Sequence, residues 1–211
     1  MNTPLAERMR PQTLDEYAGQ AHLIGKDKPL RRAIEQGLLP SMIFWGPPGV
    51  GKTTLANIIS NMLKRPFYTL SAINSGVKDV REVIEKAQSQ HFFGQNKPVL
   101  FIDEIHRFSK SQQDSLLGAV EKGVVTLIGA TTENPSFEVI PALLSRCQVF
   151  VLEHLSKQEL ENLLHQAIEK DEFLKLKKIE LKETDFLLRV SGGDGRKLLN
   201  ALEIVVNAAQ S

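Results

Sequence analysis

The sequence contains little cysteine, few aromatic side chains and no excess of either charge. Cys147 is its one cysteine, so no disulfide can form within the chain, which suits a reducing compartment. Lys and Arg number 26 against 25 Asp and Glu, so no basic tail exists to attract nucleic acid by charge alone. The longest apolar runs, such as 99–102, are far below the roughly 20 residues of a membrane helix, and no secretory signal precedes them. We therefore expect a cytoplasmic protein with no membrane partner.

Short β-rich runs alternate with helical patterns over the first three quarters of the 211 residues. Alternation of this kind favours a parallel sheet with helices on both faces. We predict an α/β fold with three α/β/α layers and a five-stranded parallel sheet. Its strands are expected at 41–45, 67–70, 98–102, 124–128 and 148–152, and its helices at 52–63, 77–87 and 109–120.

After residue 152 the sequence predicts helices alone. Ser156 followed by Glu159 is a capping-box pattern, and further helical patterns cover 184–190 and 196–209. We predict an α/β domain over residues 1–153 and a small all-helical domain over 154–211.

The segment Gly46-Pro47-Pro48-Gly49-Val50-Gly51-Lys52-Thr53 fits the phosphate-loop pattern. Glycines let backbone amides close around phosphate oxygens, and the N-terminus of the following helix favours negative charge. Lys52 would reach the β- and γ-phosphates, and the Thr53 hydroxyl would bind Mg²⁺. Because the segment lies between a predicted strand and a predicted helix, a plain Gly/Pro turn is the weaker interpretation.

Two acids end the buried run at 99–102. Asp103 would hold the Mg²⁺ through water, and Glu104 would activate the water that attacks the γ-phosphate. A solvated strand end is the alternative. The phosphate loop about 50 residues earlier favours the catalytic interpretation, so the two motifs together predict a nucleotidase.

Neighbouring segments narrow this prediction to one family. The Pro-Pro in the loop, the Asp-Glu pair, the segment 129–135 and Leu144-Ser145-Arg146-Cys147 together resemble the AAA+ ATPases, especially clamp-loader subunits and the Holliday-junction branch-migration motor. The segments Arg10–Gln20, Asp103–Phe108 and Gly129–Phe137 resemble the replication-associated recombination protein A family, which is related to the Werner-helicase-interacting ATPases. The resemblance covers nearly the whole chain.

The resemblance implies further residue roles. The sensor-1 residue would be Thr132, with Thr131 second. Arg146 would be an arginine finger that reaches the ATP of a neighbouring subunit, and Arg196 would be the sensor-2 arginine of the helical lid. Strand-end turns and surface ion pairs are the ordinary alternatives for these residues. Ser71 is a weaker candidate for restraining Glu104.

The resemblance also implies a nucleotide site, which would bind ATP or ADP. Its phosphate-side residues would be Gly46, Pro47, Pro48, Gly49, Val50, Gly51, Lys52, Thr53 and Thr54, and its adenine-side residues would be Arg10, Pro11, Tyr17 and Ile24. For Tyr17 a purely structural place in the core is equally compatible with the sequence.

The predicted function is a DNA-dependent ATPase, cytoplasmic and nucleoid-associated, that acts in replication-fork maintenance, recombination and repair. Its partners would be single-stranded, gapped or forked DNA, further copies of itself and, as candidates, single-strand-binding protein and replisome components. Two alternatives stay open: a nucleotide-gated scaffold with incidental hydrolysis, and a branch-migration motor. Family members continue into a C-terminal oligomerisation region, which we expect to be absent from this sequence.

Overall fold

The computed structural model describes residues 3–92 and 96–209, which form two compact units. One contains residues 21–46 and 52–152 and is called the sheet unit below. The other contains the N-terminal residues through Gln20, the short segment Pro47–Gly51 and the chain from Glu153 onward, and is called the helical unit. Among the described residues, no helix is both long and apolar enough to cross a membrane.

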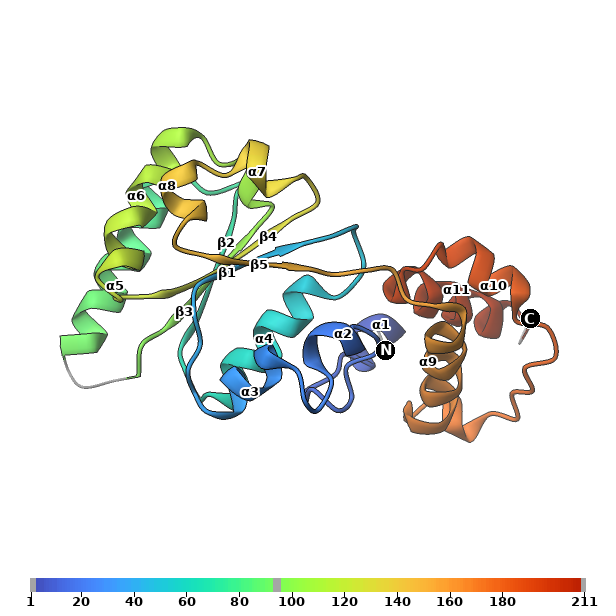
Figure 1. Cartoon of the computed structure of the whole chain (residues 1–211). Coiled ribbons are helices and arrows are strands. Elements are labelled where there is room, and N and C mark those ends of the chain that lie inside the picture. Colours follow the sequence, from blue (N-terminus) through green and yellow to red (C-terminus); the bar gives the residue numbers. More distant parts are fainter. Residues whose placement is uncertain (1–2, 93–95, 210–211) are drawn as a thin grey trace. The chain divides into compact units, whose positions relative to one another are not determined.

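The sheet unit is built on five parallel strands in the order β2-β3-β4-β1-β5 (Figure 1). These strands are β1 (Met42–Trp45), β2 (Phe67–Ser71), β3 (Val99–Asp103), β4 (Thr126–Thr131) and β5 (Gln148–Val151). Strands β1, β3 and β4 are the inner ones and are almost entirely buried, as expected for a sheet covered on both faces. The five predicted strands and the predicted fold class are confirmed.

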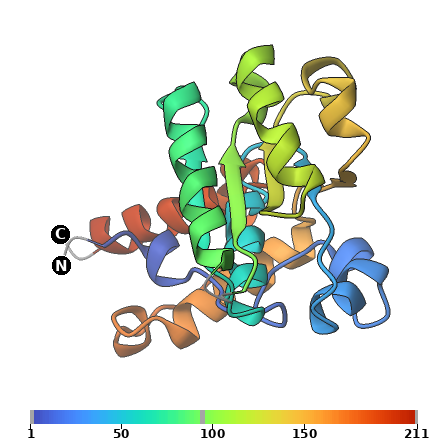
Figure 2. The same cartoon turned by 90° about the vertical axis from the view of Figure 1, so that its left-hand side faces the viewer.

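Helices cover both faces of this sheet. The unit contains α2 (Ala21–Ile24), α3 (Pro29–Glu35), α4 (Lys52–Met62), α5 (Val77–Phe92), α6 (Lys110–Glu121), α7 (Pro135–Glu138), α8 (Pro141–Leu144) and the short 3-10 helix η1 (Ile105–Arg107). Helix α4 contacts β3 and β4, whereas α5 and α6 pack side by side on the other face (Figure 2).

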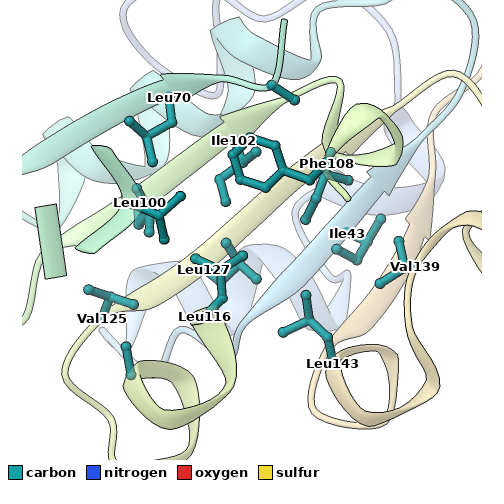
Figure 3. Close-up of a cluster of buried hydrophobic side chains, with 14 of the residues drawn as sticks. Ile43, Leu70, Leu100, Ile102, Phe108, Leu116, Val125, Leu127, Val139 and Leu143 are labelled. Carbon is teal, nitrogen blue, oxygen red and sulfur yellow. The ribbon is translucent and has the colours of Figure 1, made fainter. Parts of the chain in front are cut away.

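A buried apolar cluster fixes α5 and α6 to the sheet. Ile43, Leu100, Ile102 and Leu127 alternate along three neighbouring strands and point to one face, where Leu116 of α6 meets them (Figure 3). Each of these side chains is fully buried. The cluster therefore helps to fix the register of the strands. The candidate site lies at the carboxyl ends of these strands.

The helical unit consists of α1 (Leu5–Arg8), α9 (Lys157–Lys170), the 3-10 helix η2 (Leu174–Leu176), α10 (Asp185–Ser191) and α11 (Gly195–Ala208). Its own core contains Leu5, Leu160, Leu164, Leu198 and Leu202. The Ser156–Glu159 capping box is present at the start of α9. The all-helical texture predicted after residue 152 is confirmed for the described residues, whereas the boundary between functional domains at 153/154 stays a prediction.

Candidate functional site

The carboxyl edge of the sheet collects the predicted chemical groups of β1, β3 and β4. Because β4 pairs with both β1 and β3, the residues that follow these three strands leave the sheet at the same edge. Gly46 follows β1, and its backbone N–H donates to the carbonyl of Thr131, the last residue of β4, at 3.2 Å. Asp103 is the last residue of β3.

Lys52 opens α4 and is almost fully buried. Its ammonium donates to the carbonyl of Gly46 at 2.7 Å. Burial lowers the pKa of Lys52, while the negative charges of Glu104 and Asp103 act in the opposite direction. Lys52 therefore lies within the electrostatic field of both predicted catalytic acids, as a nucleotide site of this type needs. Thr53 and Thr54 follow in the first turn of α4 and are partly exposed.

Asp103 and Glu104 differ in how the backbone presents them. Asp103 pairs in register with Ser71 of β2, and its carbonyl accepts from the N–H of Ala72 at 3.1 Å. Glu104 leaves the strand in the left-handed region, with φ of 55°. Its carboxylate lies 3.2 Å from Nε2 of His106 and 3.8 Å from Nε of Arg107. No role was predicted for His106.

The two threonines after β4 occupy different environments. Thr131 is fully buried, and its hydroxyl oxygen accepts from the N–H of Glu133 at 3.0 Å and lies 3.0 Å from Nδ1 of His106. Thr132 is partly exposed beyond the strand end. Neither is placed against a nucleotide here, so the assignment of sensor 1 to Thr132 stays a prediction.

The phosphate-loop residues 47–51 belong to the helical unit, where two side chains pack against their glycines. The hydroxyl of Tyr17 donates to the carbonyl of Val50 at 2.9 Å, and a Cβ on Gly51 would lie 2.5 Å from that hydroxyl oxygen. A Cβ on Gly49 would clash with the carboxylate of Asp194. Gly49 and Gly51 have φ of 76° and 90°, so their backbone shape and their surroundings both require glycine.

Tyr17 and Asp194 are buried polar residues of this loop environment. Burial raises the pKa of the Tyr17 phenol, which keeps it protonated as a donor. Asp194 caps α11 by accepting from the N–H of Lys197 at 3.0 Å. Sequence reasoning placed Tyr17 near adenine and gave Asp194 no role. The structure shows Tyr17 in contact with the loop backbone and leaves its adenine role untested.

The remaining predicted residues are dispersed. In the helical unit, Arg10 forms an ion pair with Glu7 at 2.7 Å, Pro11 is partly buried, and Arg196 is exposed in the first turn of α11. In the sheet unit, Ile24 is buried within α2. Their nucleotide contacts stay predictions.

Arg146 follows α8 on the surface of the sheet unit. It forms an ion pair with Glu121 of α6, and its guanidinium also donates to the carbonyl of Ala142 and to the Ser145 hydroxyl. The side chain is 38% exposed. The pairing with Glu121 was not predicted. It is an exposed contact, so a partner of higher negative charge could displace it.

The available donors at this edge suit magnesium and a nucleotide. A threonine hydroxyl and a carboxylate are hard oxygen ligands of the kind that Mg²⁺ prefers, usually with several waters retained. Among the described residues no group of three or more His, Cys, Asp or Glu forms a metal cluster. Thr53 and Asp103 thus fit an ion shared with bound phosphates rather than a cage made by the protein alone.

Comparison with known proteins identifies the family. The model of the ATPase family associated with various cellular activities (AAA) matches residues 42–155. Replication-associated recombination protein A of Haemophilus influenzae is 51% identical over 210 residues, which cover 98% of this chain and 47% of that protein. ATPase WRNIP1 of Dictyostelium discoideum is 46% identical over 97% of this chain and 24% of its own length.

A solved structure shares the fold. The RuvB Holliday junction branch migration motor of Thermotoga maritima is 30% identical, with a TM-score of 0.71 over 91% of this chain and 63% of that one. The chain spans about half the length of the bacterial recombination proteins that it matches. It belongs to the AAA family of ATPases and, within that family, to the group formed by replication-associated recombination protein A and its WRNIP1 relatives.

Proposed function

We propose that this chain binds ATP with Mg²⁺ and hydrolyses it to ADP and phosphate, with Glu104 as the general base. The observation that carries the proposal is the position of Lys52, whose buried ammonium lies within the field of both Asp103 and Glu104 at one edge of the sheet. A site of this kind suits a phosphate ligand bound together with a divalent cation, because a buried ammonium attracts the phosphates and the two carboxylates attract the cation.

In this proposal each residue has one task. The backbone amides of residues 46–51 and the ammonium of Lys52 hold the phosphates, and Thr53 and Asp103 hold Mg²⁺, which neutralises developing charge when bound. Glu104 takes the proton of the attacking water as that water reaches the γ-phosphate. Thr132 would orient the water as sensor 1, and Arg196 would contact the γ-phosphate as sensor 2.

Glu104→Gln tests the proposal. The amide keeps the shape of the side chain and cannot take a proton, so ATP should still bind while turnover falls by roughly 100-fold or more. Fluorescent-nucleotide binding and phosphate release measure the two effects. Glu85→Gln, on the exposed face of α5, is the matched control and should retain full turnover. Unchanged turnover in Glu104→Gln would remove Glu104 from the role of base.

We further propose that the hydrolysis depends on DNA and on neighbouring copies of the chain. The names of the relatives, which refer to replication-associated recombination and to branch migration, support a DNA substrate at stalled forks or gapped duplexes. Exposed Arg146 fits a finger in trans. A cytoplasmic, nucleoid-associated setting follows from such a substrate.

Arg146→Ala tests the trans arrangement. The variant should keep its affinity for ATP, because the finger would serve a neighbour's nucleotide, and should lose most DNA-stimulated turnover. Mixing Arg146→Ala with Glu104→Gln should restore part of the activity, since mixed interfaces join a working base to a working finger. A large loss of ATP affinity in Arg146→Ala would instead make this arginine a ligand of its own subunit's nucleotide.

A further inference from the structure

His106 connects the proposed base to the end of a neighbouring strand. Its Nε2 lies 3.2 Å from a carboxylate oxygen of Glu104, and its Nδ1 lies 3.0 Å from the hydroxyl oxygen of Thr131. The imidazole is 11% exposed, against 25% for the Glu104 side chain. Glu104 follows β3, His106 lies in η1 and Thr131 ends β4, so one ring joins three elements of the sheet unit.

The hydrogens of this chain of contacts can be assigned from chemistry. A carboxylate only accepts hydrogen bonds, so Nε2 must donate to Glu104. In a neutral imidazole Nδ1 is then an acceptor, and the Thr131 hydroxyl must donate to it. The same hydroxyl lies 3.0 Å from the carbonyl of Glu133, and its single hydrogen can serve only one of the two acceptors at a time. The orientation of the Thr131 hydroxyl is therefore linked to the contact that holds Glu104.

The backbone conformation of Glu104 bears on the contact between its carboxylate and His106. A left-handed conformation is unfavourable for a non-glycine residue, and such strain is common at functional positions. The conformation directs the chain into η1, where the N–H of Arg107 donates to the carbonyl of Glu104 at 2.8 Å. Arg107, a second side chain beside the carboxylate, is 57% exposed and stands farther away, at 3.8 Å. His106 is thus the closer and the more buried of these two contacts to the carboxylate.

We propose that His106 is a positioning residue for the proposed reaction: it holds the Glu104 carboxylate in one orientation and anchors it to the end of β4 through Thr131. The inference rests on the proposed role of Glu104. Because Thr132 follows Thr131 directly, the anchor also links the base to the strand end that carries the sensor-1 candidate. A displacement at that strand end would reach Glu104 through the imidazole.

Three substitutions of His106 distinguish a role in positioning the Glu104 carboxylate from a role in filling space. His106→Phe keeps a ring and removes both nitrogens, so kcat for ATP hydrolysis should fall roughly 10- to 100-fold while KM stays within about twofold. His106→Gln places an amide nitrogen near the position of Nε2 and should retain a substantial part of kcat. His106→Asn reaches towards Thr131 but stops short of Glu104, so its kcat should fall nearly as far as that of His106→Phe.

A double-mutant cycle with Thr131→Val tests the anchor. Removing the hydroxyl should lower kcat when His106 is present and have little further effect beside His106→Phe, because the two residues act through the same contact. Kinetics, thermal unfolding and ATP affinity are measured for every variant. Additive losses in the cycle would overturn the anchor.

The result for Glu104→Gln separates this inference from the proposed function. If Glu104→Gln loses turnover and His106→Phe retains kcat within about twofold, the positioning role is wrong and the base assignment stands. If Glu104→Gln keeps its turnover, the proposed base fails and the inference fails with it. Equal kcat values for His106→Gln and His106→Asn would also contradict positioning through Nε2.

Discussion

Cys147 illustrates how the position of a residue controls its chemistry. Its thiol is packed against the core of the sheet unit, and burial raises its pKa to about 11. At pH 8 about one such thiol in a thousand is ionised, against about one in ten at the ordinary pKa near 9. Burial therefore makes this cysteine a weak nucleophile.

We predict that native Cys147 reacts with iodoacetamide at pH 8 about 100-fold more slowly than the same cysteine in the urea-unfolded chain, because the thiolate is the reacting form. Mass spectrometry of labelled peptides over time measures both rates. The native rate should rise as the pH approaches 11. Equal rates for the native and unfolded chains at pH 8 would contradict the burial of this thiol.

Residues within local motifs were predictable, whereas residues that act through tertiary contacts were not. A strand, a loop and the spacing between the two motifs can be recognised in the sequence, and they predict Lys52, Asp103 and Glu104. The structure brings these three residues to one edge of the sheet. The contact between His106 and Thr131 joins residues 25 positions apart through a side chain. No periodicity or motif encodes such a pair, so only the folded structure shows it.

At the scale of single elements, the helix caps carry the clearest local instructions. Ser156 accepts from the N–H of Glu159 at 3.3 Å, and the Glu159 carboxylate accepts from the N–H of Ser156 at 2.7 Å. The same reciprocal pair occurs at Ser109 and Gln112 before α6. Both boxes satisfy backbone donors that a helix start leaves without partners.

We predict that Ser156→Ala lowers the free energy of unfolding by about 1 kcal/mol, because the start of α9 loses its side-chain acceptor. Ser156→Asn should restore most of this loss, since asparagine caps equally well and its amide adds no charge beside the Glu159 carboxylate. Urea unfolding with an unchanged slope provides the measurement. A Ser156→Ala variant as stable as the parent would show that solvent replaces the cap without cost.

Helices α4, α6 and α11 were predicted within one residue of their bounds, whereas α5 continues to Phe92, beyond its predicted end at 87, and the four-residue helices were missed. Helices α4, α6, α9 and α11 carry enough turns for apolar spacing to be recognised. Helices α1, α2, α7 and α8 contain four residues each, which is too short for any period. Helices α7 and α8 begin with Pro135 and Pro141 in the first turn, and proline at that position is the signal that could have indicated them.

At the scale of the whole molecule, the N-terminal residues join the unit formed by the end of the described chain. The guanidinium of Arg8 in α1 contacts Asp171 at 2.7 Å and Glu203 at 3.0 Å, and the backbone N–H of Leu5 donates to Glu203 at 3.0 Å. Asp171 is 163 positions from Arg8 and follows α9. These contacts join residues far apart in the sequence, and no local pattern indicates them.

This network sets a pH dependence. Burial alone would raise the pKa of Asp171, but hydrogen bonds from Arg8 and from the backbone N–H groups of Leu174 and Phe173 outweigh it and hold that pKa below its usual range. A carboxyl with a lowered pKa contributes stability above its unfolded pKa of about 3.9 and loses it as the pH falls through the folded value. The contribution is therefore complete at neutral pH.

We predict that Arg8→Met destabilises the helical unit by about 3 kcal/mol at pH 7, because the nearly buried Asp171 carboxylate loses its charged partner. The deficit should shrink as the pH falls below about 4 and through the lowered pKa of Asp171 in the parent, because protonation removes the charge that Arg8 stabilises. Hydrogen exchange should accelerate in peptides from α9 and α11, while peptides from β3 and β4 keep their protection.

Lys157→Met is the matched control, because it removes an exposed ion pair with Asp185 in the same unit and should change exchange little. A deficit that stays constant from pH 7 to pH 3 would show that Arg8 stabilises the unit by packing rather than through the charge of Asp171, and equal acceleration in β3 and β4 would show that the two units unfold together.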